Sequence, residues 1–338
     1  MRFLHSSRVS RLPRLRHWGA VLGILLLPGL AAAAEPPAPA QAAQPPAPPA
    51  AQPEKPSEVL KHANELLTGN KFDEAETEFR RAETLAGGPC GECALGIATV
   101  RASEGKWGES ADLIQRALPL LTAPAVLSRA YNQLGMAYVK EGGAENLAKA
   151  EEAMRSAVDY GGAWGNIARV NLAQVLFLEG RWADAAPAAR EALEKTATDP
   201  DMSKAARIIL CQARSHLPDE LPIEGGDPAG IMRVGGDVSR PEKVAGVQPA
   251  YTAEARKSKA HGVVILESVI DTEGCMRQMK VLKGLPDGLS EAALDATRLW
   301  VFSPARLQEK PVPVYYTLTV NFQISDTPAP GIPPPPHR

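Results

Sequence analysis

The chain has 338 residues, of which 44% are hydrophobic and 22% are charged, and its formal net charge at pH 7 is −2. This composition is typical of a soluble globular protein of about two domains. The slight acidity gives no reason to propose a nucleic-acid partner, because nucleic-acid-binding domains present clustered positive charge.

The first 34 residues are typical of an export signal. Five arginines from Arg2 to Arg16 precede an apolar stretch at residues 18–27, and Ala31 to Ala34 supply the small residues that a signal peptidase needs. We therefore expect cleavage near Ala34 and a periplasmic protein. The alternative is an uncleaved inner-membrane anchor facing the periplasm, since residues 18–34 reach the short end of what spans a bilayer.

Two segments have compositions that cannot form a packed core. Residues 35–56 are almost wholly Ala, Pro and Gln, and we expect them to form a disordered, extended linker. Residues 325–338 are Pro-rich and are expected to form a disordered tail. Neither segment is assigned a binding role.

Residues 57–217 carry an internal repeat of small residues. One series is Ala82, Ala117, Ala157 and Ala192, and a second is Ala63, Ala98, Gly135 and Ala173. A period of about 34 residues or slightly more, with small residues where two helices cross, is the signature of tetratricopeptide repeats. The segments 133–138 and 180–185 resemble that family in sequence. We expect a solenoid of four repeats, followed by a capping helix over residues 202–216.

Residues 218–240 contain two glycine pairs and are predicted to be a linker. The segment 241–324 then predicts a ββαβ unit, because β-branched strands flank a turn at Asp271–Gly274 and a short amphipathic helix begins at Leu289. The expected fold class is thus α + (α+β), a helical solenoid followed by a small domain with one sheet.

The final strand of this unit alternates apolar and polar residues from Val314 to Ile324. We expect it to lie at a free edge, where unpaired N–H and C=O groups can bind another chain. The outward-facing candidates for partner binding are Tyr315, Thr317, Thr319 and Asn321. The alternatives are a polar face that contacts only water, or a strand paired with a partner subunit or with the N-terminal part of its own domain.

An ordered series of short motifs runs through this unit. The motifs are Gln248-Pro-Ala-Tyr251 with Ala255-Arg256, Gly262-Val263-Val264, Ile270-Asp271-x-x-Gly274, Val281-Leu282, Leu289-x-x-Ala292-Ala293, Trp300-x-Phe302-x-Pro304-Ala305 and Lys310-Pro-Val-Pro-Val314. In this order they resemble the TonB C-terminal domain, the periplasmic end of energy transducers that engage outer-membrane receptors. The resemblance implies a fold and a mode of binding, but no catalysis.

Two consequences of this resemblance concern particular residues. Gln248, Pro249 and Tyr251 join the candidate partner-binding residues, because they belong to the first motif. TonB transducers carry arginines around the tryptophan, whereas this chain has Leu299 and Val301 there, which puts a receptor contact by those positions in doubt.

Cys90 and Cys93 form the one motif that could carry chemistry. In an oxidising compartment a CxxC pair is a redox pair, a structural disulfide, or two reduced cysteines that pack in a helix. A redox enzyme is disfavoured because no strand precedes the motif and no βαβ frame surrounds it. Cys211 and Cys275 lie in different predicted domains; a bridge would pin the domains together, but the sequence alone does not indicate one.

We assign no catalytic, cofactor-binding or metal-binding residue. His62, His216, His261 and His337 are scattered and share no metal-ligand spacing. Nucleophile elbows, phosphate-binding loops and paired-carboxylate patterns are not evident in the sequence.

The predicted function is that of a non-enzymatic periplasmic adaptor linked to TonB-type outer-membrane transport. Its TonB-like domain would bind a receptor peptide by strand addition, and its solenoid would bind another protein. One alternative is a membrane-anchored TonB-type energy transducer, which requires residues 1–34 to be retained. Further alternatives are a periplasmic thiol oxidoreductase using Cys90 and Cys93, and a structural component of an envelope complex.

Overall fold

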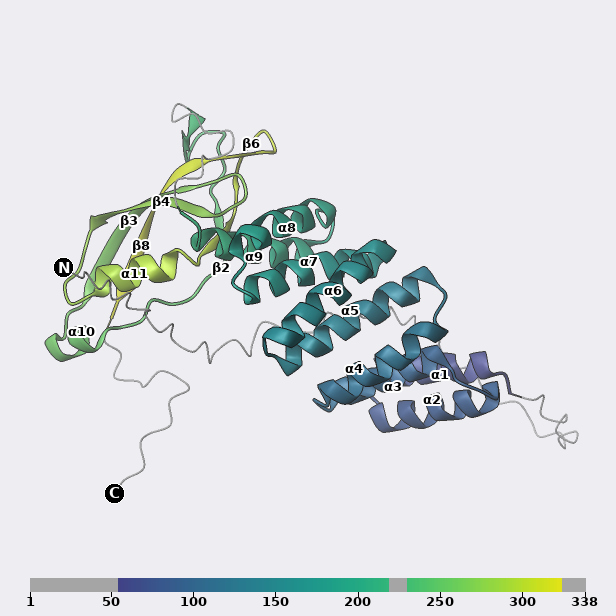
Figure 1. Cartoon of the computed structure of the whole chain (residues 1–338). Coiled ribbons are helices and arrows are strands. Elements are labelled where there is room, and N and C mark those ends of the chain that lie inside the picture. The colour runs from purple at the N-terminus through teal and green to yellow at the C-terminus, as the bar shows by residue number, and fades with distance from the viewer. Residues whose placement is uncertain (1–53, 219–229, 324–338) are drawn as a thin grey trace, which may run out of the picture.

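The computed structural model describes residues 54–218 and 230–323 (Figure 1). The export signal or anchor predicted for residues 1–34, nearly all of the linker at 35–56 and the tail at 325–338 lie outside the described residues. Helices come first along the chain and strands follow, so the expected fold class is confirmed.

Residues 54–218 form a row of α-helices joined by short turns. They are α1 (Pro56–Thr68), α2 (Phe72–Ala86), α3 (Gly91–Ser103), α4 (Trp107–Ala117), α5 (Pro124–Glu141), α6 (Ala144–Tyr160), α7 (Gly162–Leu178), α8 (Trp182–Lys195) and α9 (Pro200–Ser215), with a 3-10 turn η1 (Leu118–Leu120) after α4. Each odd-numbered helix up to α7 packs on the even-numbered helix that follows it, and the pairs stack in chain order (Figure 1). The predicted helical solenoid is confirmed, and α9 lies where the capping helix is predicted.

The small residues of the repeat lie where helices cross. Ala63, Ala98 and Ala173 are all fully buried. Gly96 in α3 has no room for a side chain, because a Cβ there would overlap the ring of Phe79 from α2. Gly135 of the repeat series is in the same situation, because a Cβ there would overlap the side chain of Met154 from α6. Such close approaches explain why the repeat spacing was visible in small residues rather than in large ones.

The C-terminal domain contains eight short strands and two helices within residues 230–323. They are β1 (Met232–Arg233), β2 (Glu242–Ala245), α10 (Ala253–Ser258), β3 (Gly262–Ile270), β4 (Met276–Lys283), α11 (Leu289–Thr297), β5 (Val301–Ser303), β6 (Ala305–Leu307), β7 (Lys310–Val312) and β8 (Val314–Phe322). The main sheet has the order β1-β8-β3-β4, and two small sheets pair β2 with β5 and β6 with β7. The predicted ββαβ unit corresponds to β3, β4, α11 and β8.

The core of this domain lies between the main sheet and α11. Leu289 and Ala293 of α11 are fully buried in one cluster with Leu266 of β3 and Leu318 of β8. Phe302, at 3% exposure, belongs to the same cluster. The alternation seen in the sequence therefore reflects one face packed on α11.

The main sheet differs from the favoured prediction in two ways, the second of which was one of the stated alternatives. The linker predicted for 218–240 is shorter than expected, because β1 lies within it and pairs in parallel with Val314 and Tyr315. The last strand, β8, is therefore not wholly at a free edge, and the start of its outer edge is covered by the N-terminal part of its own domain. A two-residue strand carries no periodic pattern, which is why the sequence did not show it.

The two domains share a core at α9. Asp199 caps α9, since its side chain accepts the backbone N–H groups of Asp201 and Met202 at 3.1 and 3.0 Å. Cys275 and Val301 from the C-terminal domain are buried in the same apolar cluster as the solenoid. In Figure 1 the C-terminal domain lies at the α9 end of the helical row.

Candidate functional site

The outer edge of β8 is the first candidate site. β3 pairs with β8 along all nine residues of both strands, from Gly262 with Phe322 to Ile270 with Val314. On the other side, the N–H of Met232 in β1 donates to the Pro313 carbonyl at 2.9 Å. The β8 strand is thus held along one edge and covered only at its start on the other.

The direction of the backbone groups follows from that bond. N–H and C=O groups of successive residues in a strand alternate between its two edges, so those of Thr317, Thr319 and Asn321 point to the same side as Pro313 O. Within residues 54–218 and 230–323, no strand pairs with β8 beyond Tyr315 on that side. Three residues of β8 therefore present unpaired backbone groups in the described chain.

The side chains of β8 divide into two faces. Leu318, Val320 and Phe322 are buried on the α11 side, while Thr317, Thr319 and Asn321 are exposed. Tyr315 is half-buried, and the guanidinium of Arg233 in β1 lies 5.5 Å from its ring centroid. Of the four predicted β8 residues, three thus lie along the open part of the edge, and Tyr315 lies beside β1, where it is paired with Arg233.

The three predicted residues before α10 lie elsewhere in the domain. Gln248 is exposed and Pro249 is half-buried. The hydroxyl of Tyr251 donates to the carbonyl of Ala260, and its ring meets Phe322 edge-on with centroids 5.9 Å apart. Tyr251 therefore packs at the far end of β8, within its own domain.

The junction with the solenoid is the second polar site. The turn between β3 and β4 inserts Glu273 between two arginines, with Arg190 Nε of α8 2.5 Å from Glu273 Oε1 and Arg214 of α9 also paired with Glu273. Arg214 Nη1 lies 2.9 Å from Asp271 Oδ2, and Arg207 Nη1 donates to the Glu273 carbonyl at 2.5 Å. One turn of the C-terminal domain is thus bound by three arginines of the last two solenoid helices.

Asp271 is the most deeply buried acid of this junction, at 2% exposure. Its Oδ1 accepts the N–H groups of Glu273 at 3.0 Å and Cys275 at 2.9 Å, which holds the turn closed. Burial raises the pKa of the Asp271 carboxyl, and the positive charge of Arg214 opposes that shift. The residue is a turn former, as predicted, and it also pairs with the solenoid.

Both cysteine pairs are disulfides. Cys90 is bonded to Cys93, and Cys211 of α9 is bonded to Cys275 after the β3–β4 turn. Of the alternatives left open for Cys90 and Cys93, the structure contains the disulfide and not two reduced packing cysteines. The second bridge, which the sequence did not indicate, joins the two domains covalently.

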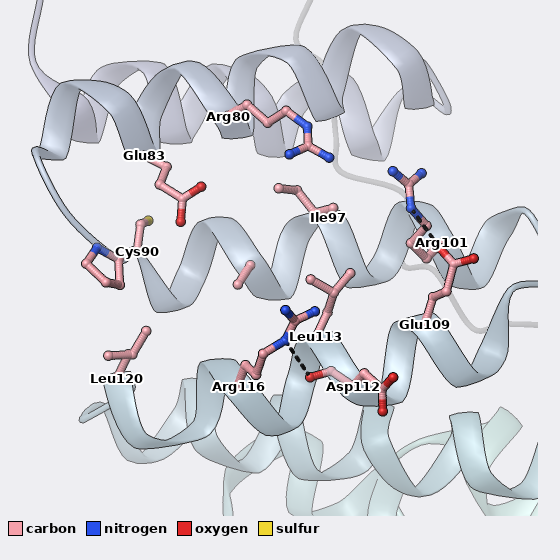
Figure 2. Close-up of a pocket in the computed structure, with 12 residues that line it drawn as sticks. Arg80, Glu83, Cys90, Ile97, Arg101, Glu109, Asp112, Leu113, Arg116 and Leu120 are labelled. Atoms are coloured by element: carbon pink, nitrogen blue, oxygen red, sulfur yellow. Dashed lines mark hydrogen bonds and ion pairs between the residues drawn. The ribbon is translucent and has the colours of Figure 1, made fainter.

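A pocket of about 540 Å³ lies beside the first disulfide, between α2, α3 and α4 (Figure 2). Its floor includes Ala94, Ile97 and Leu113, while its walls carry charged side chains such as Glu83 and Arg116. Cys90 lines one end of the pocket. The sequence did not point to this pocket, because its residues come from three helices with no shared motif.

Polar side chains also connect the odd-numbered helices of the solenoid. Asn171 Nδ2 in α7 donates to Asn132 Oδ1 in α5 at 2.9 Å, and Gln133 Nε2 in α5 donates to Thr99 Oγ1 in α3 at 3.3 Å. Burial lowers the pKa of Arg129 in α5. In this polar row Asn132 is buried and holds Asn171 in place, so the half-buried Thr99, Gln133 and Asn171 are the candidates for contact with a peptide backbone. Sequence analysis had not singled them out.

Over 54–218 and 230–323, no group of three His, Cys, Asp or Glu side chains is placed to hold a metal ion. In those ranges no helix has the length and apolar character needed to cross a membrane.

Comparison with known families matches both parts of the chain. Residues 60–123 and 134–200 match the tetratricopeptide repeat, and residues 247–324 match the Gram-negative bacterial TonB protein C-terminal domain. The chain joins tetratricopeptide repeats to a TonB C-terminal domain. Among curated proteins, none matches it.

Solved structures similar to the chain are tetratricopeptide proteins. MamA from Desulfovibrio magneticus RS-1 is 20% identical, with 43% of this chain and 78% of that chain covered and a TM-score of 0.36. YrrB, described as a TPR protein with an unusual peptide-binding site, is 20% identical, with 47% and 75% covered and a TM-score of 0.38. A thermophilic TPR protein from Thermus thermophilus is 19% identical, with 47% and 80% covered and a TM-score of 0.37.

The TonB motifs of this chain meet one another in space. The N–H of Phe302 donates to the Gly274 carbonyl at 2.9 Å, and a Cβ at Gly274 would overlap Phe302 O. Trp300 is half-buried, and its Nε1 donates to the Val247 carbonyl at 2.7 Å, next to the first motif. The motifs that carry the resemblance therefore serve the internal packing of the TonB domain.

The departure from the TonB pattern has a structural reason here. TonB transducers carry arginines around the tryptophan. In this chain Val301 follows the tryptophan, and it is fully buried in the apolar cluster of the solenoid. A charged side chain at that position would have to be buried without a partner, which is costly. The apolar residue suits a TonB domain that packs on a tetratricopeptide helix.

Proposed function

We propose that this protein is a periplasmic, non-enzymatic adaptor with two protein-binding modules. In this proposal the TonB domain binds an extended peptide segment of an outer-membrane receptor along the outer edge of β8, and the solenoid binds a second protein. The link to TonB-type transport follows from the family of the C-terminal domain. The observation that carries the proposal is the open backbone edge at Thr317, Thr319 and Asn321.

Strand addition suits this edge because β8 is already ordered. Its ladder with β3 spans nine residue pairs, so β8 loses little freedom when a peptide binds. The peptide alone bears the ordering cost, and its main-chain hydrogen bonds supply most of the affinity. β1 limits the open stretch on its N-terminal side, so the peptide strand begins opposite residues after Tyr315.

The solenoid supports a second binding role through its polar row. The half-buried amide of Asn171 can donate to and accept from a peptide backbone at the same time, while the buried Asn132 holds it in place. The two modules are joined rigidly by the Cys211–Cys275 bridge, so two bound partners would be held at a fixed separation. This arrangement suits an adaptor.

The test is a change of one backbone donor on β8. Thr319→Pro removes an outward N–H without affecting the ladder to β3, and proline is tolerated at a sheet edge. Loss of one hydrogen bond, about 1 kcal/mol, weakens binding about fivefold. The proline ring also obstructs the neighbouring bonds, so we expect a larger loss.

The measurement is isothermal titration of the protein with peptides from the N-terminal segments of outer-membrane receptors of the same cell. Thr319→Val is the matched control, because it keeps the N–H and the branched shape and should bind like the wild type. Equal affinities of the wild type and a folded Thr319→Pro variant would exclude this edge as the docking site.

A second candidate is a membrane-anchored energy transducer of the TonB type. It is supported by the apolar stretch of residues 18–34 and by the Pro-rich segment after it. Intact-mass analysis and membrane fractionation decide between the two: a mature protein that begins near Glu35 supports the adaptor, and retention of residues 1–34 in the membrane fraction supports the transducer.

A further inference from the structure

The two disulfides differ in how accessible they are to a thiol of another molecule. We propose that Cys90–Cys93 is a thiol–disulfide exchange site that reacts with a cysteine thiol of an extended peptide bound in the pocket between α2, α3 and α4. The exchange would be a stoichiometric reaction of this one bridge rather than enzymatic turnover; it is separate from strand addition at β8 and does not depend on the adaptor proposal.

The first argument is the unequal exposure of the two cysteines. Cys90 is half-buried and lines the pocket, whereas Cys93 is 0% exposed in a cluster with Val59, Phe79 and Ile97. An incoming thiolate can therefore attack only Cys90 Sγ. Attack there makes Cys93 the leaving group, so Cys93 stays in the protein as a thiol while Cys90 carries the mixed disulfide with the peptide.

The second argument is the contrast with the other bridge. Cys211 and Cys275 are 3% and 2% exposed and lie between the domains, beside the Arg214–Asp271 ion pair. A thiol can reach that bridge only after the domains separate. The protein thus contains its own matched control, a buried structural disulfide in the same chain.

The third argument is the position of Cys90 at the start of a helix. Cys90 is the N-cap of α3, and its Sγ accepts the backbone N–H of Cys93 at 3.1 Å. N-terminal N–H groups of a helix stabilise a thiolate, which is the form that leaves when the mixed disulfide is resolved. In thiol oxidoreductases a strand and a tight turn place the cysteine at a helix N-terminus; here the turn between α2 and α3 does so.

The pocket favours a peptide over a small free thiol. Figure 2 shows Cys90, Glu83 and Leu120 at one end and Arg101 and Glu109 at the other, so the pocket extends along α3 from the disulfide. Its volume of about 540 Å³ falls within the range of about 300–1,000 Å³ typical of ligand sites. An apolar floor with charges of both signs on its walls suits an extended polypeptide segment.

The reaction balances without a further reagent. A thiolate of the peptide attacks Cys90 Sγ, the Cys90–Cys93 bond breaks, and Cys93 takes the proton of the attacking thiol. A second thiol of the same partner attacks the mixed disulfide, and Cys90 leaves with its proton. Two thiols of the partner are oxidised to a disulfide, and Cys90 and Cys93 are reduced to thiols.

The first measurement follows both bridges of the full chain in the presence of a synthetic extended peptide with two cysteines. Acid quenching, alkylation and peptide mass analysis report each disulfide separately. Because Cys211–Cys275 requires local opening, we expect Cys90–Cys93 to be reduced at least about tenfold faster. Reduction of both bridges at the same rate, or of Cys211–Cys275 first, would overturn the proposal.

The second measurement tests the pocket and the assigned attack site. Cys93→Ala leaves Cys90 as a free thiol, which we expect to trap the peptide, presented with an activated disulfide, as a stable adduct at Cys90. Ala94→Trp fills the pocket floor and should slow reduction by the peptide about tenfold, with little effect on reduction by dithiothreitol. Equal slowing of both reagents, or a trapped adduct that does not form at Cys90, would identify the bridge as structural only.

Discussion

Replacing Cys211 and Cys275 by alanine tests how strongly the two domains are coupled. This bridge closes a loop with a sequence separation of 64, whereas Cys90–Cys93 has a separation of 3. In the chain-entropy model the long loop contributes about 4 kcal/mol to the free energy of unfolding and the short one about 2 kcal/mol. The double alanine variant at 211 and 275 should therefore lose about 2 kcal/mol more than the variant at 90 and 93.

The structure gives a reason for the difference to exceed that figure. Loss of the long bridge also loosens the turn that carries Asp271 and Glu273, so only non-covalent contacts, such as the ion pairs with Arg190 and Arg214, would still hold the domains together. Loss of the short bridge affects only the start of α3. The two variants remove the same number of sulfur atoms, so each serves as the control for the other.

The assay is urea unfolding followed by far-ultraviolet circular dichroism, with intact mass confirming that the remaining disulfide is formed. Coincident transitions by circular dichroism and tryptophan fluorescence would justify a single free energy for each variant. If removal of Cys211–Cys275 costs no more than removal of Cys90–Cys93, the closed loop does not restrict the unfolded chain as argued, and the domains unfold independently.

Three further predictions concern packing and pH. Gly274→Ala should destabilise the protein by more than about 1 kcal/mol, because Gly274 has φ +89 and a Cβ there would overlap Phe302 O; thermal unfolding checks this, and an unchanged midpoint would contradict it. Gly96→Ala should cost about 1–3 kcal/mol through overlap with the ring of Phe79, and the double variant with Phe79→Leu should recover part of that loss in urea unfolding; no recovery would show that the ring is not the obstacle. Partial desolvation lowers the pKa of His216, which stacks on Trp182 and is otherwise exposed, so its stabilising contribution is present above the unfolded value of about 6.5 and is lost as the pH falls. Between about pH 7.5 and about pH 5.5, the free energy of unfolding should then fall more in the wild type than in His216→Gln. An equal fall in the two proteins would show that His216 does not have a lowered pKa in the folded state.

The repeats and the ββαβ unit could be predicted because their patterns are local and periodic. The spacing of small residues such as Ala98 and Ala173 marks helix crossings, and the alternation in β8 marks one buried face. Both patterns result from burial within one element and its neighbour. Such patterns do not depend on how distant segments meet.

The features that escaped prediction join distant segments. The Cys211–Cys275 bridge depends on how the two domains dock, and cysteine spacing carries no information about that. β1 has two residues, too few for a pattern, and yet it covers part of the predicted docking edge. The open stretch of the edge could be located only once the bond from Met232 to Pro313 was known.

The departure at Val301 illustrates a third situation. The sequence showed that an expected arginine is missing, but not that the position is buried against the solenoid. A missing charge has several explanations until its surroundings are known. Here the packing against the helical domain explains it.

The Cys211–Cys275 bridge also decides where mechanical load would pass. A pull on a peptide bound to β8 acts along the strand, so the nine pairs between β8 and β3 are loaded in shear and share the force. β3 leads directly into the turn that ends at Cys275, and the covalent bond there transfers tension to α9. Tension between the docking edge and the solenoid would therefore pass through the disulfide and not through the backbone of residues 216–231. The two domains would then move together under load instead of separating.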